Sequence, residues 1–188
     1  VFREVCHSTQ IWLDEWKDAR IGLNISPVDL RDDSLLGHVE AMLTRYAIPA
    51  NVLQVEVTES HALTCDDAML SRLTRLADFG LSLAIDDFGA GATTLSSLAD
   101  LPFTTLKLDR SLTQQLTNPK GHAVVQKVLE MARCLGMTTT VEGIETKEQA
   151  DLARSLGADT AQGYYFSRPR PNGDVQSWIA AGRSRVLR

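Results

Sequence analysis

Short apolar runs alternate along this chain with longer stretches in which apolar residues recur at helical spacing. One run, Leu83 to Ile85, ends at two adjacent carboxylates, Asp86 and Asp87, and a loop with two glycines follows. Five other apolar runs end in a polar residue in the same way: Asn24, Glu56, Lys107, Glu142 and Gln162. These residues recur at intervals of roughly 20 to 35 positions, the length of one strand plus one helix. The pattern therefore predicts an α/β chain with a parallel sheet.

The residues between these runs predict where the helices lie and where they end. The expected elements are a helix ending near Ala19, a strand over 21–25, a helix over 35–46, a strand over 53–57 and a helix over 70–77. Gly80, Gly136 and Gly157 each follow the last apolar turn of a helix, where glycine relieves a left-handed backbone position. Thr146 and Gln149 have the spacing of a capping box, which predicts the start of the helix before Gly157.

The number of predicted strands bears on how the sheet is completed. A closed (β/α)8 barrel has eight strands, and this chain supplies about six. A sheet that lacks two strands would leave long apolar edges unpaired, which folded proteins avoid. We therefore expect a (β/α)8 TIM-like barrel whose other strands lie in about 60–70 residues upstream of Val1 or come from another chain. The chain begins inside a helical pattern without an N-cap, which fits a cut at that point.

Composition limits the partners of the chain. Its 188 residues carry a net charge of −5, which argues against a general nucleic-acid surface, so neither DNA nor RNA is expected as a partner. No stretch approaches the ~20 apolar residues of a membrane span, so we expect no membrane contact by this segment. The isolated Cys6, Cys65 and Cys134 indicate reduced, mostly buried thiols of a cytoplasmic protein. We expect one domain over residues 1–182 and a frayed basic tail over residues 183–188.

The acidic residues at the predicted strand ends suggest a metal site. Parallel strands carry their reactive side chains at one end, so four negative charges would meet there, those of Glu56, Asp86, Asp87 and Glu142. Such carboxylates repel one another unless a cation lies between them. Oxygen ligands of this kind suit Mg²⁺ or Mn²⁺ rather than zinc. Because successive strand residues face opposite ways, we expect a loop that opens at Asp87 to turn both aspartates toward a two-metal site.

Each of these residues alone has an ordinary explanation. A strand-end Asn24 is more often a turn former than a ligand, Glu56 could be a half-exposed strand residue, and Lys107 could be a solvated cation. The Asp-Phe-Gly triplet that starts at Asp87 is also found in protein kinases. However, the chain has no His-Arg-Asp triplet and no glycine-rich loop before a lysine strand. The joint pattern is what favours a metal-dependent hydrolytic site.

The motifs around these residues resemble the EAL domain of bacterial cyclic-di-GMP phosphodiesterases. Six motifs occur in the family order and span nearly the whole chain. They are residues 24–27 (NISP), 55–60 (VEVTES), 85–91 (IDDFGAG), 106–111 (LKLDRS), 141–146 (VEGIET) and 162–169 (QGYYFSRP). The resemblance implies a (β/α)8-type barrel that uses two Mg²⁺ or Mn²⁺ ions to hydrolyse one phosphodiester bond of cyclic-di-GMP, giving linear pGpG.

The resemblance also implies a role for each matching residue. The implied metal ligands are Asn24, Glu56, Asp86, Asp87 and Glu142, with Asp86 bridging the two ions. The implied catalytic residues are Lys107, Gln162, Glu59 and Glu145. Lys107 would hold the attacking water or a phosphate oxygen, and Gln162 would orient water. Glu59 would brace the loop after the aspartates, and Glu145 would be a supporting carboxylate near the rim.

Two departures from the family pattern shape the hypotheses. The Glu-Ala-Leu motif is absent, and with it a further metal ligand and a substrate-contacting arginine, so we expect weak turnover by the chain as it stands. Ala92 occupies a position that is usually aromatic. The leading hypothesis is a cyclic-di-GMP phosphodiesterase of bacterial signalling, for which family behaviour allows a homodimer. The alternatives are a catalytically silent cyclic-di-GMP receptor or scaffold and a different metal-dependent barrel hydrolase.

Overall fold

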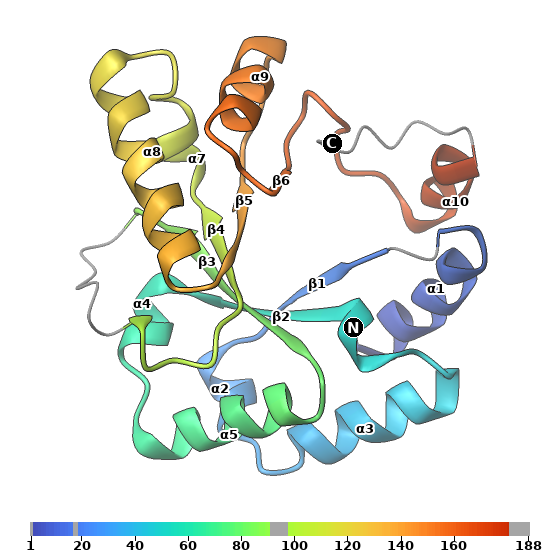
Figure 1. Ribbon diagram of the computed structural model, residues 1–188. Helices are drawn as coiled ribbons and strands as arrows, with labels where there is room; N and C mark the ends of the chain where they lie inside the picture. The colour runs from blue at the N-terminus through green and yellow to red at the C-terminus, as the bar shows by residue number, and fades with distance from the viewer. Residues whose placement is uncertain (1, 17–18, 91–97, 181–188) are drawn as a thin grey trace. The chain divides into compact units, whose positions relative to one another are not determined.

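The fold was obtained as a computed structural model, which describes residues 2–16, 19–90 and 98–180 (Figure 1). The strands are β1 (Ile21–Asn24), β2 (Leu53–Thr58), β3 (Ser82–Phe88), β4 (Thr105–Leu108), β5 (Thr138–Val141) and β6 (Thr160–Ala161). The longer helices are α1 (Phe2–Glu15), α3 (Leu35–Tyr46), α5 (Asp67–Asp78), α8 (Pro119–Cys134), α9 (Lys147–Ser155) and α10 (Asn172–Ala180). The short ones are α2 (Pro27–Leu30), η1 (Ala50–Val52), α4 (Glu59–Leu63) and α7 (Arg110–Thr113).

The strands follow one another in the order β1-β2-β3-β4-β5-β6, which is also their order along the chain. The pairs β1·β2, β3·β4, β4·β5 and β5·β6 are all parallel. A helix or a helical pair separates consecutive strands at most of the crossovers. This arrangement confirms the predicted α/β class and the six predicted strands. It also places the carboxyl ends of paired strands at the same edge of the sheet.

The described residues divide into two compact units. The first unit takes in the described parts of residues 1–57, 65–83 and 170–184. It contains the parallel pair β1·β2, in which Asn24 lies opposite Glu56. Helix α1 contacts α3 and α10, and α5 contacts α2 and α3. Fully buried leucines, among them Leu30, Leu53 and Leu73, fill the core of this unit.

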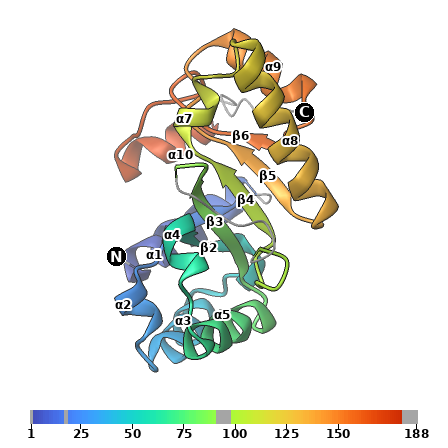
Figure 2. The ribbon, with the colours of Figure 1, turned by 90° about the vertical axis from the view of Figure 1, so that its left-hand side faces the viewer.

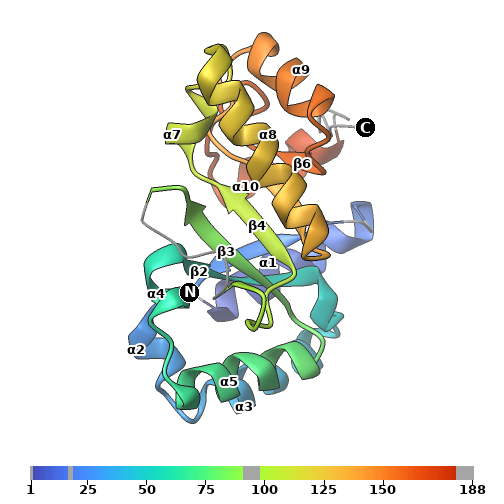
Figure 3. The same cartoon turned by 60° about the vertical axis from the view of Figure 1, so that its left-hand side comes forward.

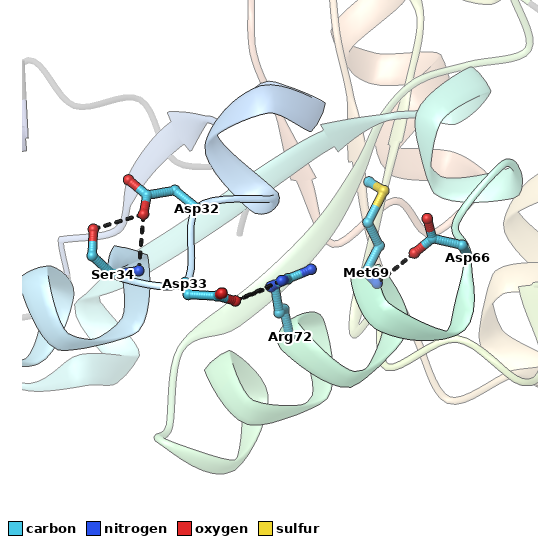
Figure 4. A network of polar contacts seen from close by, with 6 residues as sticks. All are labelled: Asp32, Asp33, Ser34, Asp66, Met69 and Arg72. Atoms are coloured by element: carbon cyan, nitrogen blue, oxygen red, sulfur yellow. Dashed lines mark hydrogen bonds and ion pairs between the residues drawn. The ribbon is translucent and has the colours of Figure 1, made fainter.

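Polar contacts fix the entry into α5 within the first unit (Figure 4). The Asp66 side chain accepts a hydrogen bond from the backbone N–H of Met69 at 2.8 Å, which caps the first turn of the helix. One turn further on, Arg72 Nη2 lies 2.6 Å from Asp33 Oδ1. Because Asp33 is almost fully exposed, this surface pair orients the helix more than it stabilises the fold.

The second unit takes in residues 58–64 and the described part of residues 84–169. It contains the greater part of β3 together with β4, β5 and β6. Helix α8 packs against β5 and α7, and Figures 2 and 3 show it running along the strands. The side chains of Ile85, Leu106 and Leu129 are fully buried in this layer. These side chains form part of the core of the second unit.

Several local predictions are confirmed, and others need correction. Gly80, Gly136 and Gly157 have φ angles of 103°, 71° and 79°, and the capping box of Thr146 and Gln149 is present. The first helix ends at Glu15 rather than near residue 19. Short helices α2 and α4 follow β1 and β2, at positions to which the sequence analysis assigned no element.

Three further predictions concern the thiols, the tail and the membrane. Only Cys6 of the three free cysteines is buried, since Cys65 is partly exposed and Cys134 is exposed. Ala92 and the basic tail over residues 183–188 lie outside the described residues. Among the residues that the structure describes, we find no helix with the length and apolar character needed to span a membrane.

Candidate metal and hydrolytic site

Three neighbouring strands of the second unit bring charged residues to one edge of the sheet. Asp86 lies in β3, Lys107 lies in β4, and Glu142 directly follows β5. The ladder continues past the strand ends, because the Glu142 N–H donates to the Leu108 carbonyl at 3.1 Å. Parallel pairing in this register aims the side chains toward a common point.

Lys107 joins the two carboxylates on either side of it. Its Nζ lies 2.9 Å from Asp86 Oδ1 and 2.9 Å from Glu142 Oε1. The residue is only 5% exposed, and Asp86 is 8% exposed. A buried ammonium needs compensating negative charge, and these two ion pairs provide it. Lys107 is therefore not the solvated strand-end cation that its position alone allowed.

Asp87 reaches the same point because the backbone of β3 is irregular. Asp87 has a φ of 55°, and the β3·β4 register shifts between Ile85 and Phe88. A bulge of this kind lets two successive side chains escape the strict alternation of a strand. One carboxylate oxygen each from Asp86, Asp87 and Glu142 lies within 4.8 Å of the others. The expected loop opening at Asp87 is thus wrong in detail, since the strand continues to Phe88 and a bulge brings the aspartates together.

The electrostatics of the cluster favour a bound cation. Burial raises the pKa of Asp87, and the nearby charges of Asp86 and Asp109 raise it further, while Lys107 lowers it. Asp86 Oδ1 is buried and, apart from its ion pair with Lys107, accepts no hydrogen bond from the described residues. Three clustered carboxylates with such an oxygen fit a hard divalent cation with oxygen ligands. The donor set contains neither His nor Cys, so zinc is a poorer match.

Glu59 contacts the turn that follows the aspartates. The side chain is 4% exposed, and its Oε2 accepts a hydrogen bond from the Gly89 N–H at 2.8 Å. Gly89 has a φ of 99°, which strains any other residue, and a Cβ there would lie 2.4 Å from Leu112 Cδ1, so that the leucine side chain would have to move. This contact places Glu59 beside the segment that it was expected to brace, while its part in catalysis stays a prediction.

Glu145 lies in the segment after β5, and Gln162 directly follows β6. The Gln162 N–H donates to the Val141 carbonyl at 2.9 Å, and the Gln162 carbonyl accepts from the Ile144 N–H at 3.0 Å. These bonds set the Gln162 backbone directly beside the segment that carries Glu142. Glu145 Oε1 pairs with Arg110 Nη2 at 2.6 Å, and both side chains are about half exposed.

Arg110 is a site neighbour that the residue-by-residue analysis did not single out. It stands inside the LDRS motif, three residues after Lys107. A Cβ at Gly143 would lie 2.5 Å from Arg110 Cγ, so the arginine stem lies across the glycine that follows Glu142. The signal available in the sequence was an arginine next to a strand end together with a carboxylate after the next strand.

Asn24 and Glu56 form a separate pair in the first unit. They are register partners on β1 and β2, and the Ile25 N–H donates to the Glu56 carbonyl at 3.0 Å. Glu56 is 8% exposed, so it is not a half-exposed strand residue. Its carboxylate lies over Gly22, where a Cβ would be 2.2 Å from Oε1. An amide and a carboxylate at adjacent strand ends are again oxygen ligands for a hard cation.

These observations define a class of protein: a parallel α/β chain whose strand ends carry a carboxylate cluster with an embedded lysine. Comparison with known families agrees with that class. Residues 1–169 match the model of the EAL domain, and the chain therefore belongs to the EAL domain family. The family resemblance inferred from the six motifs is confirmed.

Individual relatives show the same relationship. The chain is 38% identical over 152 residues to the cyclic di-GMP phosphodiesterase RocR of Pseudomonas aeruginosa, covering 80% of this chain and 39% of RocR. It covers between 20% and 39% of the length of this and the next three curated relatives, which are longer proteins. Resemblance to them therefore concerns one portion of each.

Two solved structures share the fold and carry ligands. The PaMucR phosphodiesterase in complex with c-di-GMP aligns with a TM-score of 0.85 and 32% identity, over 93% of this chain and 71% of that one. The manganese and cyclic-di-GMP complex of Klebsiella pneumoniae BlrP1 aligns with a TM-score of 0.81 and 29% identity, over 91% of this chain and 44% of that one. These alignments confirm an α/β fold of the EAL type.

Proposed function

We propose that this chain forms part of a cyclic-di-GMP phosphodiesterase, which opens the cyclic dinucleotide to linear pGpG. The observation that carries the proposal is the Asp86–Lys107–Glu142 cluster, in which a buried ammonium lies between two carboxylates at 2.9 Å each. Membership of the EAL family and the relatives that are cyclic-di-GMP phosphodiesterases or bind c-di-GMP support the choice of substrate.

The proposed reaction is hydrolysis of one phosphodiester bond. The oxygen of a water molecule bonds to phosphorus, the bond from phosphorus to one ribose oxygen breaks, and that oxygen takes up a proton. Divalent cations, when bound, would activate the water and screen the phosphate charge. Lys107 places a positive charge next to the carboxylates and would stabilise the negative charge that develops on the phosphate. Gln162 would orient the water through its side-chain amide.

We assign the metal ligands and supporting residues as the family resemblance implies. Asp86, Asp87 and Glu142 would hold one cation, and Asn24 and Glu56 would be the further metal ligands. The preferred ions are two Mg²⁺ or Mn²⁺, in line with the donor chemistry. Glu59 would keep the Gly89 turn in place, and Glu145 would act beside Arg110. Family behaviour further suggests a homodimer.

The proposal is tested by incubating the full-length protein that contains this chain with cyclic-di-GMP and separating the products by chromatography. We expect pGpG to form in the presence of Mg²⁺ or Mn²⁺ and to disappear when EDTA is added. Tight binding of cyclic-di-GMP without pGpG would establish the receptor hypothesis instead. Neither binding nor turnover would refute both, and hydrolysis of other phosphodiesters alone would favour a different barrel hydrolase.

Gly22→Ala is predicted to disturb the first-unit ligand pair while leaving the fold intact. The added Cβ would lie 2.2 Å from Glu56 Oε1 and 2.7 Å from its Cδ, so the carboxylate must move. We expect weaker Mn²⁺ binding, measured by titration with electron paramagnetic resonance detection, and little change in melting temperature. Gly37→Ala is the matched control, because nothing lies within 4 Å of its Cβ and alanine favours the helix interior. Equal Mn²⁺ affinity of both variants would contradict the assignment of Glu56.

A further inference from the structure

Strand β6, which directly precedes the site residue Gln162, is unusually short. It consists of Thr160 and Ala161, which pair with Thr140 and Val141 of β5, and Figure 1 shows the two strands side by side. Typical strands have about five or six residues. Two backbone pairs specify the register of a strand only weakly. The structure must therefore hold β6 in place by other contacts.

A set of side-chain hydrogen bonds supplies these contacts, and we call it the threonine–aspartate clasp: Thr139, Thr140, Asp159 and Thr160. Asp159 Oδ2 accepts from both the N–H and the Oγ1 hydroxyl of Thr139 at 2.8 Å each. The Asp159 N–H donates to Thr139 Oγ1 at 3.2 Å. The hydroxyls of Thr140 and Thr160 lie 2.7 Å apart, and Thr160 Oγ1 also donates to the Thr139 carbonyl at 3.2 Å.

The clasp lies directly before the two site residues on these strands. Glu142 follows Thr140 by two positions, and Gln162 follows Thr160 by two positions. Side chains two positions apart in an extended segment share a face, so the threonine pair marks the face on which Glu142 and Gln162 emerge. A slip of one residue would replace Gln162 by Ala161 or Gly163 at the site.

The clasp joins one buried residue, Thr139, to Asp159 and Thr160, which are exposed. Thr139 is 2% exposed, so its hydroxyl and N–H need partners within the protein. Asp159 provides an acceptor for both at a point where β6 has not yet begun. A one-residue shift of β6 would break these bonds and leave the buried N–H and hydroxyl of Thr139 unpaired, which is unfavourable. The energetic penalty therefore selects a single register.

We propose that the threonine–aspartate clasp positions Gln162 for the reaction by fixing the register of β6 on β5. Asp159 and Thr139 are positioning residues in this proposal, because they act through Gln162 and through the backbone bond from the Gln162 N–H to the Val141 carbonyl. The proposal deepens the proposed function and rests on it for the role of Gln162. The register effect itself does not depend on which substrate is bound.

The first test is amide hydrogen exchange in the full-length protein, followed by mass spectrometry. We expect Asp159→Ala and Thr139→Val to speed exchange at Gln162 and Ile144 at least tenfold, since both amides donate across the β5–β6 junction. Thr138→Val is the matched control: it removes the 3.0 Å hydroxyl contact with Thr105 and the 3.2 Å bond to the Thr104 carbonyl, which lie between β4 and β5 and not between β5 and β6. Unchanged exchange at Gln162 and Ile144 in the clasp variants would overturn the proposal.

The second test separates positioning from general stabilisation. Asp159→Ala should lower kcat by ~10²-fold, the cost of misplacing a reacting group by about 1 Å, with a smaller change in KM. Asp159→Asn keeps an oxygen acceptor for the Thr139 N–H and should restore most of the rate. In a variant that already carries Gln162→Ala, the further substitution Asp159→Ala should lower kcat only slightly more. If the double variant lost kcat by the product of the two single fold-losses, the two residues would act independently, and the proposal that Asp159 acts through Gln162 would be refuted.

The outcomes also distinguish this proposal from the proposed function. If the wild-type protein does not hydrolyse cyclic-di-GMP, the proposed function fails, while the exchange measurement still decides whether the clasp fixes the register. If Asp159→Ala does not fold, Thr160→Val removes the 2.7 Å hydroxyl pair with Thr140 and the 3.2 Å bond to the Thr139 carbonyl, and it provides the same comparison. Faster exchange at Gln162 in that variant supports the proposal, and unchanged exchange contradicts it.

Discussion

Replacement of Lys107 by alanine is expected to lower kcat for cyclic-di-GMP hydrolysis by ~10²–10³-fold, the usual loss when one preorganised electrostatic partner is removed. The reason is the position of Nζ, which lies 2.9 Å from both Asp86 and Glu142 in a site that solvent scarcely reaches. Binding of cyclic-di-GMP should persist, because the carboxylates that would hold the cations remain. The measurement is initial-rate formation of pGpG at saturating Mg²⁺, with binding followed by calorimetry.

The same substitution should make stability more dependent on metal. Without the ammonium, the clustered carboxylates lose their compensating charge, and a divalent cation takes over that role. Mg²⁺ should therefore raise the melting temperature of the variant more than that of the wild type. Lys107→Met, which keeps an aliphatic stem, distinguishes loss of charge from loss of packing. Lys127→Ala is the matched control, since its ion pair with Glu130 is exposed. A rate within a few-fold of wild type for Lys107→Ala would remove the residue from the mechanism.

The strand ends were predictable from the sequence because two independent regularities coincide there. An apolar run such as Leu83 to Ile85 must be buried, and the charged Asp86 that follows it needs a polar or charged partner because it is buried as well. Parallel topology then brings the ends of β3, β4 and β5 to one edge. The end of the helix before Gly80 was also predictable, because the left-handed backbone at that position favours glycine.

The bulge at Asp87 could not be read from the sequence. Neither aspartate is unusual in a strand-to-loop junction, and the composition allowed a loop to start there. The φ of 55° at Asp87 depends on contacts from other segments, including the Glu59 bond to Gly89 and the bond from the Asp109 N–H to the Phe88 carbonyl. Such contacts join residues 20 to 30 positions apart, and the local pattern of apolar and polar residues does not predict them.

The clasp residues escaped notice for a similar reason. Thr139 and Asp159 each look ordinary, since threonine is common in strands and aspartate is common before them. Their importance arises only when β6 is laid beside β5 and the two side chains meet at 2.8 Å. Arg110 is a comparable case, because its partner Glu145 lies 35 positions later. Pairwise side-chain chemistry between strands is what the sequence pattern leaves undetermined.

Replacement of Asp87 by asparagine should separate metal binding from backbone conformation. Asparagine tolerates a φ of 55° as aspartate does, so the bulge should persist while one negative charge is lost. Burial and the charge of Asp86 raise the pKa of Asp87, which means that the free cluster carries unfavourable repulsion. The metal-free variant should therefore melt at the same temperature as the wild type or slightly higher.

The metal-bound forms should differ in the opposite direction. Loss of a ligand charge should weaken Mg²⁺ binding by at least about 10–100-fold, the loss seen when even an outer partner of a metal ligand is removed. Because ligand binding stabilises a protein in proportion to the logarithm of its concentration over Kd, the rise in melting temperature on adding Mg²⁺ should shrink. Turnover should fall with it, and Mn²⁺ should restore part of the rate. A variant that melts lower without metal yet gains as much from Mg²⁺ as the wild type would show that Asp87 supports the fold rather than the cation.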